Sequence, residues 1–191
     1  MKTLTTSIKI FLFFTVLTGI IYPLIVSGVA QLAFPSKANG SLIVQNKKVI
    51  GSELLGQSFD SSAYFTSRPS AIAYQTMPSG GSNLGLTSVK LKKVVEERKI
   101  EFLTFNRLAS NTKIPSEMLF ASASGLDPHI SPEAALLQVN RIVETRQLNP
   151  TQKQTLLLLI EQHTEKPQFY CLGLKRVNVL MLNLSLDEVF K

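Results

Sequence analysis

The sequence predicts an α+β fold, in which one N-terminal transmembrane helix precedes a small mixed α/β domain outside the cytoplasm. Two observations carry this prediction. No charged residue interrupts the apolar run at residues 10–34. The rest of the 191-residue chain alternates β-prone runs, glycine- and serine-rich loops and segments with helical periodicity. We therefore expect residues 1–9 to be a cytoplasmic N-terminus, 10–34 a membrane helix and 35–191 one soluble domain.

The apolar run is long enough for a membrane helix. About 20 helical residues cross a hydrocarbon core of about 30 Å, and a single segment in lipid satisfies its backbone only as a helix. A cleaved signal peptide is the alternative, because Gly28, Val29 and Ala30 resemble a small-residue cleavage site. The length of the run exceeds that of an ordinary signal peptide and favours a retained anchor.

The charges that flank the apolar run give a weak orientation signal. Lys2 and Lys9 precede it, and Lys37, Lys47 and Lys48 follow it. The positive-inside rule is therefore almost balanced. The short basic N-terminus favours a cytoplasmic start, which would leave the domain extracytoplasmic, at a cell (inner) membrane.

One ridge of the expected membrane helix is a candidate partner-binding face. Thr15, Gly19, Pro23 and Ser27 recur at a spacing of four residues. Small residues on one ridge let a neighbouring helix approach closely. The alternative is that glycine and proline are simply common in membrane helices.

The next segments predict a linker, a hairpin and a long loop. Residues 35–41 have the composition of a linker. Two short β-prone runs, 42–44 and 48–50, flank a polar turn at 45–47, which indicates a hairpin. Residues 51–86 are too rich in serine, glycine and proline for a long helix. Loops of that length are usually functional.

Helical patterns dominate the second half of the chain. An amphipathic helix is expected over residues 88–108, with Thr87 or Ser88 as its cap. Ser131 and Asn149 each precede a proline and so mark two further helix starts. Strands are expected at 118–121 and, as a central strand with apolar residues on both faces, at 177–184.

The composition argues against several classes of function. The net charge is +7, but the basic residues are scattered and no nucleic-acid-binding motif accompanies them. One cysteine rules out an intramolecular disulfide. With two histidines and one cysteine, a histidine- or cysteine-based metal site is not expected.

A glycine-rich loop is the most suggestive motif. From Gly80 to Thr87 the spacing matches a phosphate-binding loop, but Leu86 stands where such a loop needs lysine. A Walker site is therefore not supported. Backbone N–H groups could still meet an anion at the following helix start, and the alternative is a loop shaped for a turn or a partner.

Two further groups of residues have both a functional and a structural interpretation. Asp127 and His129 lie close to serines and suggest a membrane-anchored serine hydrolase, although a structural turn or a docking surface explains them better. Tyr64, Phe65 and Arg68 are residue types typical of interface anchors, and a buried aromatic cluster with a solvated arginine explains them equally well.

Five segments in this order resemble the KdpC family of the bacterial potassium-transporting Kdp ATPase. They are GSELLGQSF at 51–59, YFTSRPSA at 64–71, PSGGSNLG at 78–85, SASGLDPHISPEAALLQV at 122–139 and RVNVLMLNLSLD at 176–187. The N-terminal span also sits where the family has it. Two departures, Leu86-Thr87-Ser88-Val89 and Ala123, concern loop geometry.

The resemblance implies a non-catalytic, accessory subunit of a high-affinity potassium uptake complex. Its partners would be the channel-like subunit KdpA, the P-type ATPase subunit KdpB, the small peptide KdpF and membrane lipid. KdpC-like proteins are described as catalytic chaperones that stabilise the assembly and raise the ATP affinity of the ATPase subunit. The resemblance makes ATP the implied cofactor and nominates as tentative nucleotide contacts Ser79, Gly80, Gly81, Ser82 and Asn83.

An extracytoplasmic domain and direct contact with cytosolic ATP exclude one another. We therefore expect the domain to dock over the outer mouth of the channel-like subunit and to affect nucleotide binding indirectly. The partner-binding candidates are Thr15, Gly19, Pro23, Ser27, Tyr64, Phe65, Arg68, Asp127 and His129. A free-standing solute-binding module is a third possibility, and it would survive purification without partners.

Overall fold

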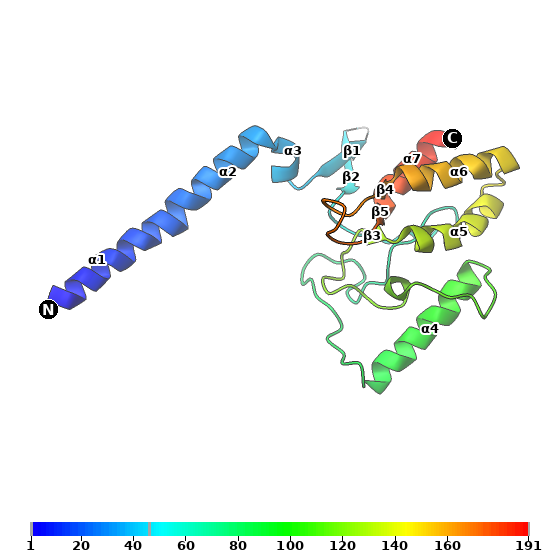
Figure 1. Ribbon diagram of the computed structural model, residues 1–191, viewed down its shortest axis with the longest axis horizontal. Helices are drawn as coiled ribbons and strands as arrows, with labels where there is room; N and C mark the ends of the chain where they lie inside the picture. The colour runs from blue at the N-terminus through cyan, green and yellow to red at the C-terminus, as the bar shows by residue number, and fades with distance from the viewer. Residues whose placement is uncertain (1, 46, 191) are drawn as a thin grey trace. The chain divides into compact units, whose positions relative to one another are not determined.

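The computed structural model describes residues 2–45 and 47–190, and the chain divides into two compact units, Met1–Ser52 and Glu53–Lys191. Figure 1 shows the first unit as a long helix that leads into a short hairpin. The second unit is a mixed α/β domain.

The first unit begins with one continuous helical stretch. It consists of α1 (Lys2–Val16), the π-helical turn η1 (Leu17–Ile21) and α2 (Tyr22–Ala33). The stretch Lys2–Ala33 has 32 residues and is long and apolar enough to cross a membrane. The expected helix is therefore present, and it begins at Lys2 rather than at residue 10.

Pro23 explains why the helix loosens in its middle. Proline has no backbone N–H, so the carbonyl of Gly19 has no donor four residues later. The π-helical turn η1 contains Gly19 and ends two residues before Pro23. Wider turns of this kind commonly accommodate a break in the hydrogen-bond ladder.

A short helical turn and a hairpin complete the first unit. The expected linker at 35–41 instead contains α3 (Pro35–Ala38), because proline is well suited to the first position of a helix. The hairpin is confirmed: β1 (Leu42–Gln45) pairs antiparallel with β2 (Lys48–Ser52). Asn46, in the turn predicted at 45–47, lies outside the described residues.

The second unit starts with a long irregular segment and one amphipathic helix. Residues 53–88 contain no helix or strand, which agrees with the prediction that 51–86 form no long helix, although Gly51 and Ser52 belong to β2. Helix α4 (Val89–Phe105) follows and confirms the expected helix. The Ser88 hydroxyl accepts a hydrogen bond from the N–H of Leu91 and caps this helix.

The expected strand at 118–121 is wrong. Residues 116–118 form a short 3-10 helix, η2 (Ser116–Met118), in which the Met118 N–H donates to the Pro115 carbonyl at 3.0 Å. The preceding proline, with its fixed φ, favours such a turn, and the turn carries Met118 into the core.

Both proline-marked helix starts are confirmed. Helix α5 (Pro132–Thr145) begins after Ser131, whose hydroxyl accepts from the N–H of Ala134. Helix α6 (Pro150–Gln162) begins with a capping box in which Asn149 and Gln152 each accept a hydrogen bond from the other's backbone N–H.

A small sheet and the last helix correct the expected strand at 177–184. Strand β5 (Arg176–Asn178) is central between β3 (His129–Ile130) and β4 (Thr164–Glu165), and both pairs are antiparallel. From Val179 onward the chain is helix α7 (Val179–Val189). The Asn178 side chain accepts from the Met181 N–H and caps α7, whose buried residues include Val179, Leu182, Asn183 and Leu186 at helical spacing.

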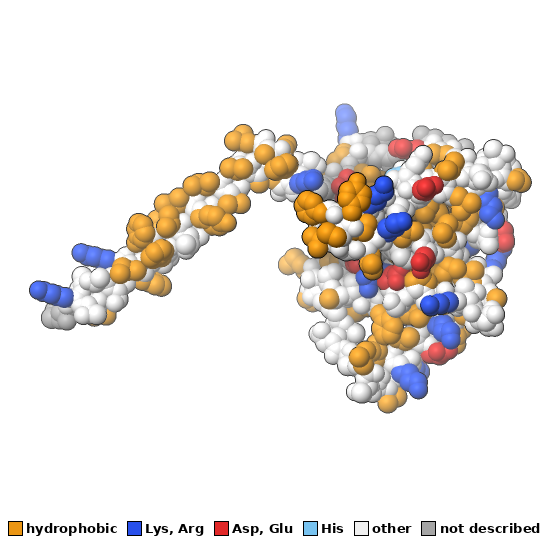
Figure 2. Space-filling view, viewed as in Figure 1, with side chains coloured by type: hydrophobic (Ala, Val, Ile, Leu, Met, Phe, Trp, Pro, Cys, Tyr) orange, Lys and Arg blue, Asp and Glu red, His pale blue; other side chains and the backbone are white. Residues whose placement is uncertain are grey.

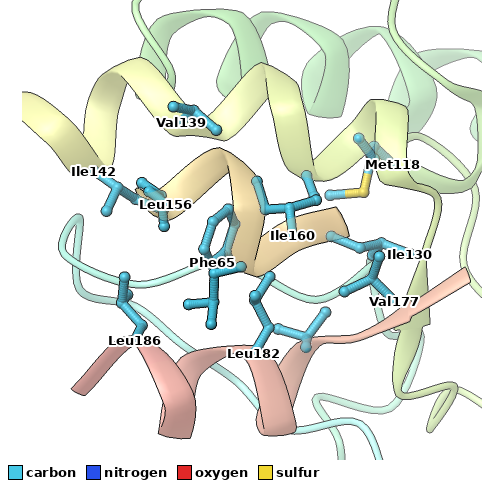
Figure 3. Packing of buried hydrophobic residues seen from close by; sticks show 14 of the residues in the cluster. Phe65, Met118, Ile130, Val139, Ile142, Leu156, Ile160, Val177, Leu182 and Leu186 are labelled. Atoms are coloured by element: carbon cyan, nitrogen blue, oxygen red, sulfur yellow. The ribbon is translucent and has the colours of Figure 1, made fainter. Parts of the chain in front are cut away.

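The hydrophobic core lies among α5, α6, α7 and the small sheet. Figure 3 shows Phe65 near the centre of this cluster, with Leu156, Leu182 and Leu186 around it. Phe65 comes from the irregular segment 53–88, which is thereby fixed to the regular elements. This attachment anchors the segment that also carries Arg68.

Candidate functional site

Two loops that are far apart in sequence meet in the second unit. The Gly80 N–H donates to the Ser124 carbonyl at 3.2 Å, which joins the loop 78–85 to the loop 121–129. A Cβ on Gly81 would lie 3.1 Å from the Ala123 carbonyl oxygen. Glycine at position 81 therefore permits a close approach of the two backbones.

Gly125, in the loop 121–129, also lies at the contact between the two loops. Its φ is +71°, and a Cβ there would lie 2.6 Å from the Ile72 Cγ1 and 3.0 Å from the Gly80 carbonyl oxygen. A side chain at this position would thus meet both a strained backbone and occupied space. The two loops form one surface feature that we call the paired loops, residues 78–85 and 121–129.

The geometry of the paired loops differs from that of a phosphate-binding loop. The N–H of Gly80 is already engaged by Ser124. Helix α4 begins only at Val89, after a turn closed by a hydrogen bond from the Ser88 N–H to the Gly85 carbonyl. The loop therefore does not lead directly into a helix N-terminus, as a phosphate cradle requires. The side chains of Ser79, Ser82 and Asn83 are exposed.

Arg68, Asp127 and His129 form an ionic cluster beside the paired loops. Arg68 Nη1 donates to Asp127 Oδ2 at 2.6 Å, and the His129 N–H donates to Asp127 Oδ1 at 3.0 Å. The His129 Nδ1 lies 3.6 Å from the same Oδ1 atom. We call these three residues the Asp127 cluster.

The Asp127 carboxylate is held in its ionised form. Burial raises its pKa, but hydrogen bonds from His129 and Arg68, together with the Arg68 charge, outweigh burial and lower the pKa to about 2. The carboxylate is therefore charged at neutral pH and acts as a hydrogen-bond acceptor rather than as a general acid.

The backbone around Asp127 is fixed by a second close approach. The Gly56 N–H donates to the Leu126 carbonyl at 2.7 Å, and a Cβ on Gly56 would lie 2.6 Å from the Asp127 carbonyl oxygen. On the other side, the Tyr74 hydroxyl donates to the Arg68 carbonyl at 2.8 Å. The cluster is thus positioned by contacts from three segments.

The Asp127 cluster lines a groove of about 580 Å³. The loop between β4 and β5 forms its other side and contributes Lys166 and Lys175, and Arg176 follows at the start of β5. Glu117 adds one further acid. The lining is rich in charge and especially in basic groups, which suits a polar or acidic segment of another molecule.

Two buried polar atoms, one in the cluster and one beside it, have no hydrogen-bond partner among the described residues. They are Arg68 Nε and Ser122 Oγ, and both residues line a second hollow with the segment 121–128. Buried polar groups are almost always satisfied. Both atoms are therefore candidates for hydrogen bonds with water or with a docked group.

The nearby serines are arranged as structural residues. Ser124 Oγ accepts from the Leu126 N–H at 3.1 Å, and Ser131 Oγ caps α5. Ser122 Oγ is enclosed. A nucleophile needs a hydroxyl that is exposed and hydrogen-bonded to a base. This arrangement does not favour the hydrolase alternative.

The described residues also contain no group of three or more His, Cys, Asp or Glu side chains that could hold a metal.

The prediction that Phe65 is an interface anchor is wrong in this structure. Its ring is 0% exposed and belongs to the core, as the alternative interpretation allowed. The arginine expected to be solvated, Arg68, is instead paired with Asp127. Tyr64 is half-buried, and its hydroxyl donates to Asp187 at 2.9 Å while Arg146 lies 4.9 Å over its ring.

The four residues predicted to form a partner-binding ridge lie exposed on the membrane-length helix. They are Thr15, Gly19, Pro23 and Ser27. Thr15 Oγ1 donates to the Phe11 carbonyl at 2.8 Å, and Gly19 lies within η1. A Cβ on Gly19 would find no atom within 4 Å among the described residues. Space for a neighbouring helix is therefore present at this position.

Sequence reasoning did not identify two features of the domain. One is Gly56, whose role depends on a partner 70 residues away. The other is an exposed apolar loop that includes Phe169 and Tyr170, between β4 and β5. The sequence contains a pattern that could have indicated this loop, because apolar residues lie between Lys166 and Lys175 without the periodicity of a strand or a helix.

Comparisons with known proteins agree on one family. The family model described as "KdpC: K+-transporting ATPase, c chain" matches residues 4–188. The Potassium-transporting ATPase KdpC subunit of Leptospira interrogans is 45% identical over 184 residues, which cover 96% of this chain and 93% of that protein. The proteins of the same name from Dechloromonas aromatica and Caldanaerobacter subterraneus are 45% and 42% identical, with coverage of 100% and 97% of this chain and 100% and 94% of their own.

Proposed function

Because the chain belongs to the KdpC family of K+-transporting ATPase c chains, we propose that it is the accessory subunit that stabilises a potassium uptake complex. The family match over residues 4–188 is the observation that carries this proposal. The membrane-length helix Lys2–Ala33 would hold the subunit in the same bilayer as its partners. Those partners are the channel-like subunit KdpA, the P-type ATPase subunit KdpB and the small peptide KdpF.

The proposed docking surface is the wall of the groove that the Asp127 cluster forms, together with the paired loops. The opposite wall, which the loop between β4 and β5 forms, is not part of this surface. The backbone of the docking surface is held by close glycine contacts and by the Arg68–Asp127 ion pair, so binding a partner costs little conformational entropy. The Asp127 cluster presents both charge signs, through Arg68 and Asp127, which favours a polar and specific contact with a partner. We propose that this surface lies against the outer mouth of the channel-like subunit.

The proposed effect on nucleotide binding is indirect. In this proposal the domain lies outside the cytoplasm and raises the ATP affinity of the ATPase subunit by favouring one arrangement of the complex. The engaged N–H of Gly80 and the distance of the loop from the start of α4 support an indirect effect over direct phosphate binding by Ser79, Gly80, Gly81, Ser82 and Asn83.

Co-purification tests the proposal. The tagged full-length chain is expressed with the other subunits, solubilised in mild detergent and recovered, and the bound proteins are identified by mass spectrometry. We expect KdpA, KdpB and KdpF to be recovered with it. Recovery of the chain alone, with normal potassium uptake in cells that lack it, would contradict the accessory role.

The groove is tested by a matched pair of histidine substitutions. His129→Ala changes the groove, whereas His163→Ala changes a half-buried histidine at the end of α6. We expect only His129→Ala to lower the recovery of partner subunits. Equal recovery with both variants would exclude His129 from the docking surface.

Cysteine labelling tests the side of the membrane. In a Cys171→Ser background, Ser110→Cys places a single thiol on an exposed loop of the domain. We expect a membrane-impermeant maleimide to label it in intact cells. Labelling only after permeabilisation would overturn the extracytoplasmic placement and would make direct nucleotide contact the better explanation.

A further inference from the structure

The loop between β4 and β5 exposes large apolar side chains at its tip. The exposed fractions are 84% for Phe169, 85% for Tyr170, 58% for Leu172 and 86% for Leu174. In Figure 2, orange side chains gather beside blue ones over the part of the domain where this loop lies. Apolar residues at this density on one short loop normally mark a binding surface. We call residues 166–175 the apolar loop.

The apolar loop has a fixed shape. Gln168 and Leu172 exchange two backbone hydrogen bonds of 2.9 Å, and the Tyr170 N–H donates to the Pro167 carbonyl at 3.0 Å. These bonds hold Phe169 and Tyr170 at φ values of +52° and +62°. Bulky residues rarely adopt this conformation, and such positions concentrate at functional sites. The two aromatic side chains are therefore presented by a tied turn.

Basic side chains flank the apolar tip. Lys166 and Lys175 are both exposed at its two ends, and Arg176 follows. Residues 166–175 contain no acidic residue, and the adjoining Glu165 is paired with Arg176 at 2.8 Å. The loop thus combines aromatic and leucine side chains with a net positive rim.

This combination fits a lipid surface better than it fits a protein. Lysine is depleted at protein–protein interfaces. Segments that lie at a bilayer surface place aromatic and leucine side chains at the acyl boundary and lysine or arginine among anionic headgroups. The chain also carries the membrane-length helix Lys2–Ala33, which would keep the domain at high effective concentration near a bilayer.

We propose that the apolar loop inserts its tip into the headgroup region of an anionic bilayer, as a second attachment of the chain to the membrane. Phe169, Tyr170 and Leu174 would lie at the acyl boundary, and Lys166 and Lys175 would contact lipid phosphates. This attachment concerns the domain surface alone and does not depend on the transport role.

The sole cysteine provides a reporter inside the loop. Cys171 is exposed and lies at the tip, so a nitroxide spin label can be attached to the otherwise unaltered full-length chain. The chain is reconstituted into vesicles of phosphatidylethanolamine and phosphatidylglycerol, or of phosphatidylcholine alone. Electron paramagnetic resonance then compares collisions of the label with oxygen, which enters lipid, and with a water-soluble nickel complex. The control label is on Ser110→Cys in the Cys171→Ser background.

In vesicles with phosphatidylglycerol we expect the Cys171 label to collide with oxygen and to be protected from nickel, and the Ser110→Cys label to remain exposed to nickel. Lys166→Gln with Lys175→Gln should lower the ratio of inserted to free loop on the order of thirtyfold. Phe169→Ser with Leu174→Ser should lower it by about a hundredfold or more. High salt should weaken insertion, and phosphatidylcholine should support it less.

Two results would overturn the proposal. One is a Cys171 label that is as accessible to nickel as the Ser110→Cys label in every vesicle. The other is protection of the label that requires co-reconstituted transport subunits and does not depend on phosphatidylglycerol, which would identify the loop as a protein interface. Circular dichroism of each variant separates a loss of insertion from a loss of folding.

Discussion

The side-chain amide of Asn183 pairs with the backbone of Phe65 from both sides. The Phe65 N–H donates to Asn183 Oδ1 at 2.8 Å, and Asn183 Nδ2 donates to the Phe65 carbonyl at 2.8 Å. The two residues are separated by 118 positions in the sequence. One residue of α7 thereby satisfies an otherwise unpaired buried backbone and holds the Phe65 ring in the core.

We expect Asn183→Ala to lower the free energy of unfolding by about 2–4 kcal/mol, because it leaves two buried backbone groups unpaired. The measurement is urea unfolding of the full chain in detergent, followed by circular dichroism. Asn140→Ala changes an exposed asparagine on α5 and should cost less than about 0.5 kcal/mol. Equal effects of the two substitutions would mean that the Asn183–Phe65 pairing does not stabilise the domain.

The Asp127 cluster makes stability depend on pH in the acid range. The folded-state pKa of Asp127, about 2, is lower than the ordinary value of 3.8 for an aspartate, so the folded protein binds fewer protons than the unfolded chain in that range. The ionised carboxylate therefore contributes stability that is complete above about pH 5 and is lost as the pH falls toward 2.

Asp127→Asn should reveal this contribution. We expect the variant to be less stable than the wild type by about 2 kcal/mol at pH 7, and the difference to shrink toward zero near pH 2. Unfolding free energies measured at several pH values test the trend. A difference that stays constant or grows in acid would contradict the low pKa. Glu161→Gln, an exposed carboxylate on α6, is the control.

Gly125 is expected to be essential for the contact between the paired loops. Gly125→Ala places a side chain at a φ of +71° and 2.6 Å from Ile72 Cγ1. Together the backbone strain and the overpacking should cost about 2–4 kcal/mol. Gly85→Ala is the control, because a Cβ there meets no atom within 4 Å. Hydrogen exchange at the Gly80 amide should accelerate only in Gly125→Ala. A slow Gly80 amide in both variants would contradict the contact.

Signals carried by local residues predicted much of the fold. Ser131 and Asn149, each followed by proline, marked helix starts because capping and the fixed φ of proline act within a few residues. The strand predicted at 177–184 is wrong from Val179 onward because the apolar residues of this run fit either an alternating or a helical pattern. Asn178 decides between them by capping α7, and that choice depends on tertiary packing.

The candidate site was less predictable than the fold. The sequence singled out Arg68, Asp127 and the glycine-rich loop, but their proximity depends on contacts between distant segments, such as Gly56 against Asp127 and Gly80 against Ser124. Phe65 and Tyr64 are neighbours in the chain, yet one is buried in the core and the other is half-exposed. Sequence composition does not distinguish such neighbours, because their burial is decided by residues of α5 and α7.

The ridge on the membrane-length helix leads to the last prediction. Gly19→Leu would fill the open space beside η1, so a neighbouring helix could no longer approach closely. We expect recovery of partner subunits in mild detergent to fall roughly tenfold, which corresponds to about 1.4 kcal/mol of lost association. Gly28→Leu is the matched control, since Gly28 also has no atom within 4 Å of its Cβ position but does not belong to the ridge. Equal recovery with the two variants would show that the helix meets its partners through another face, or that the domain alone holds the chain in the complex.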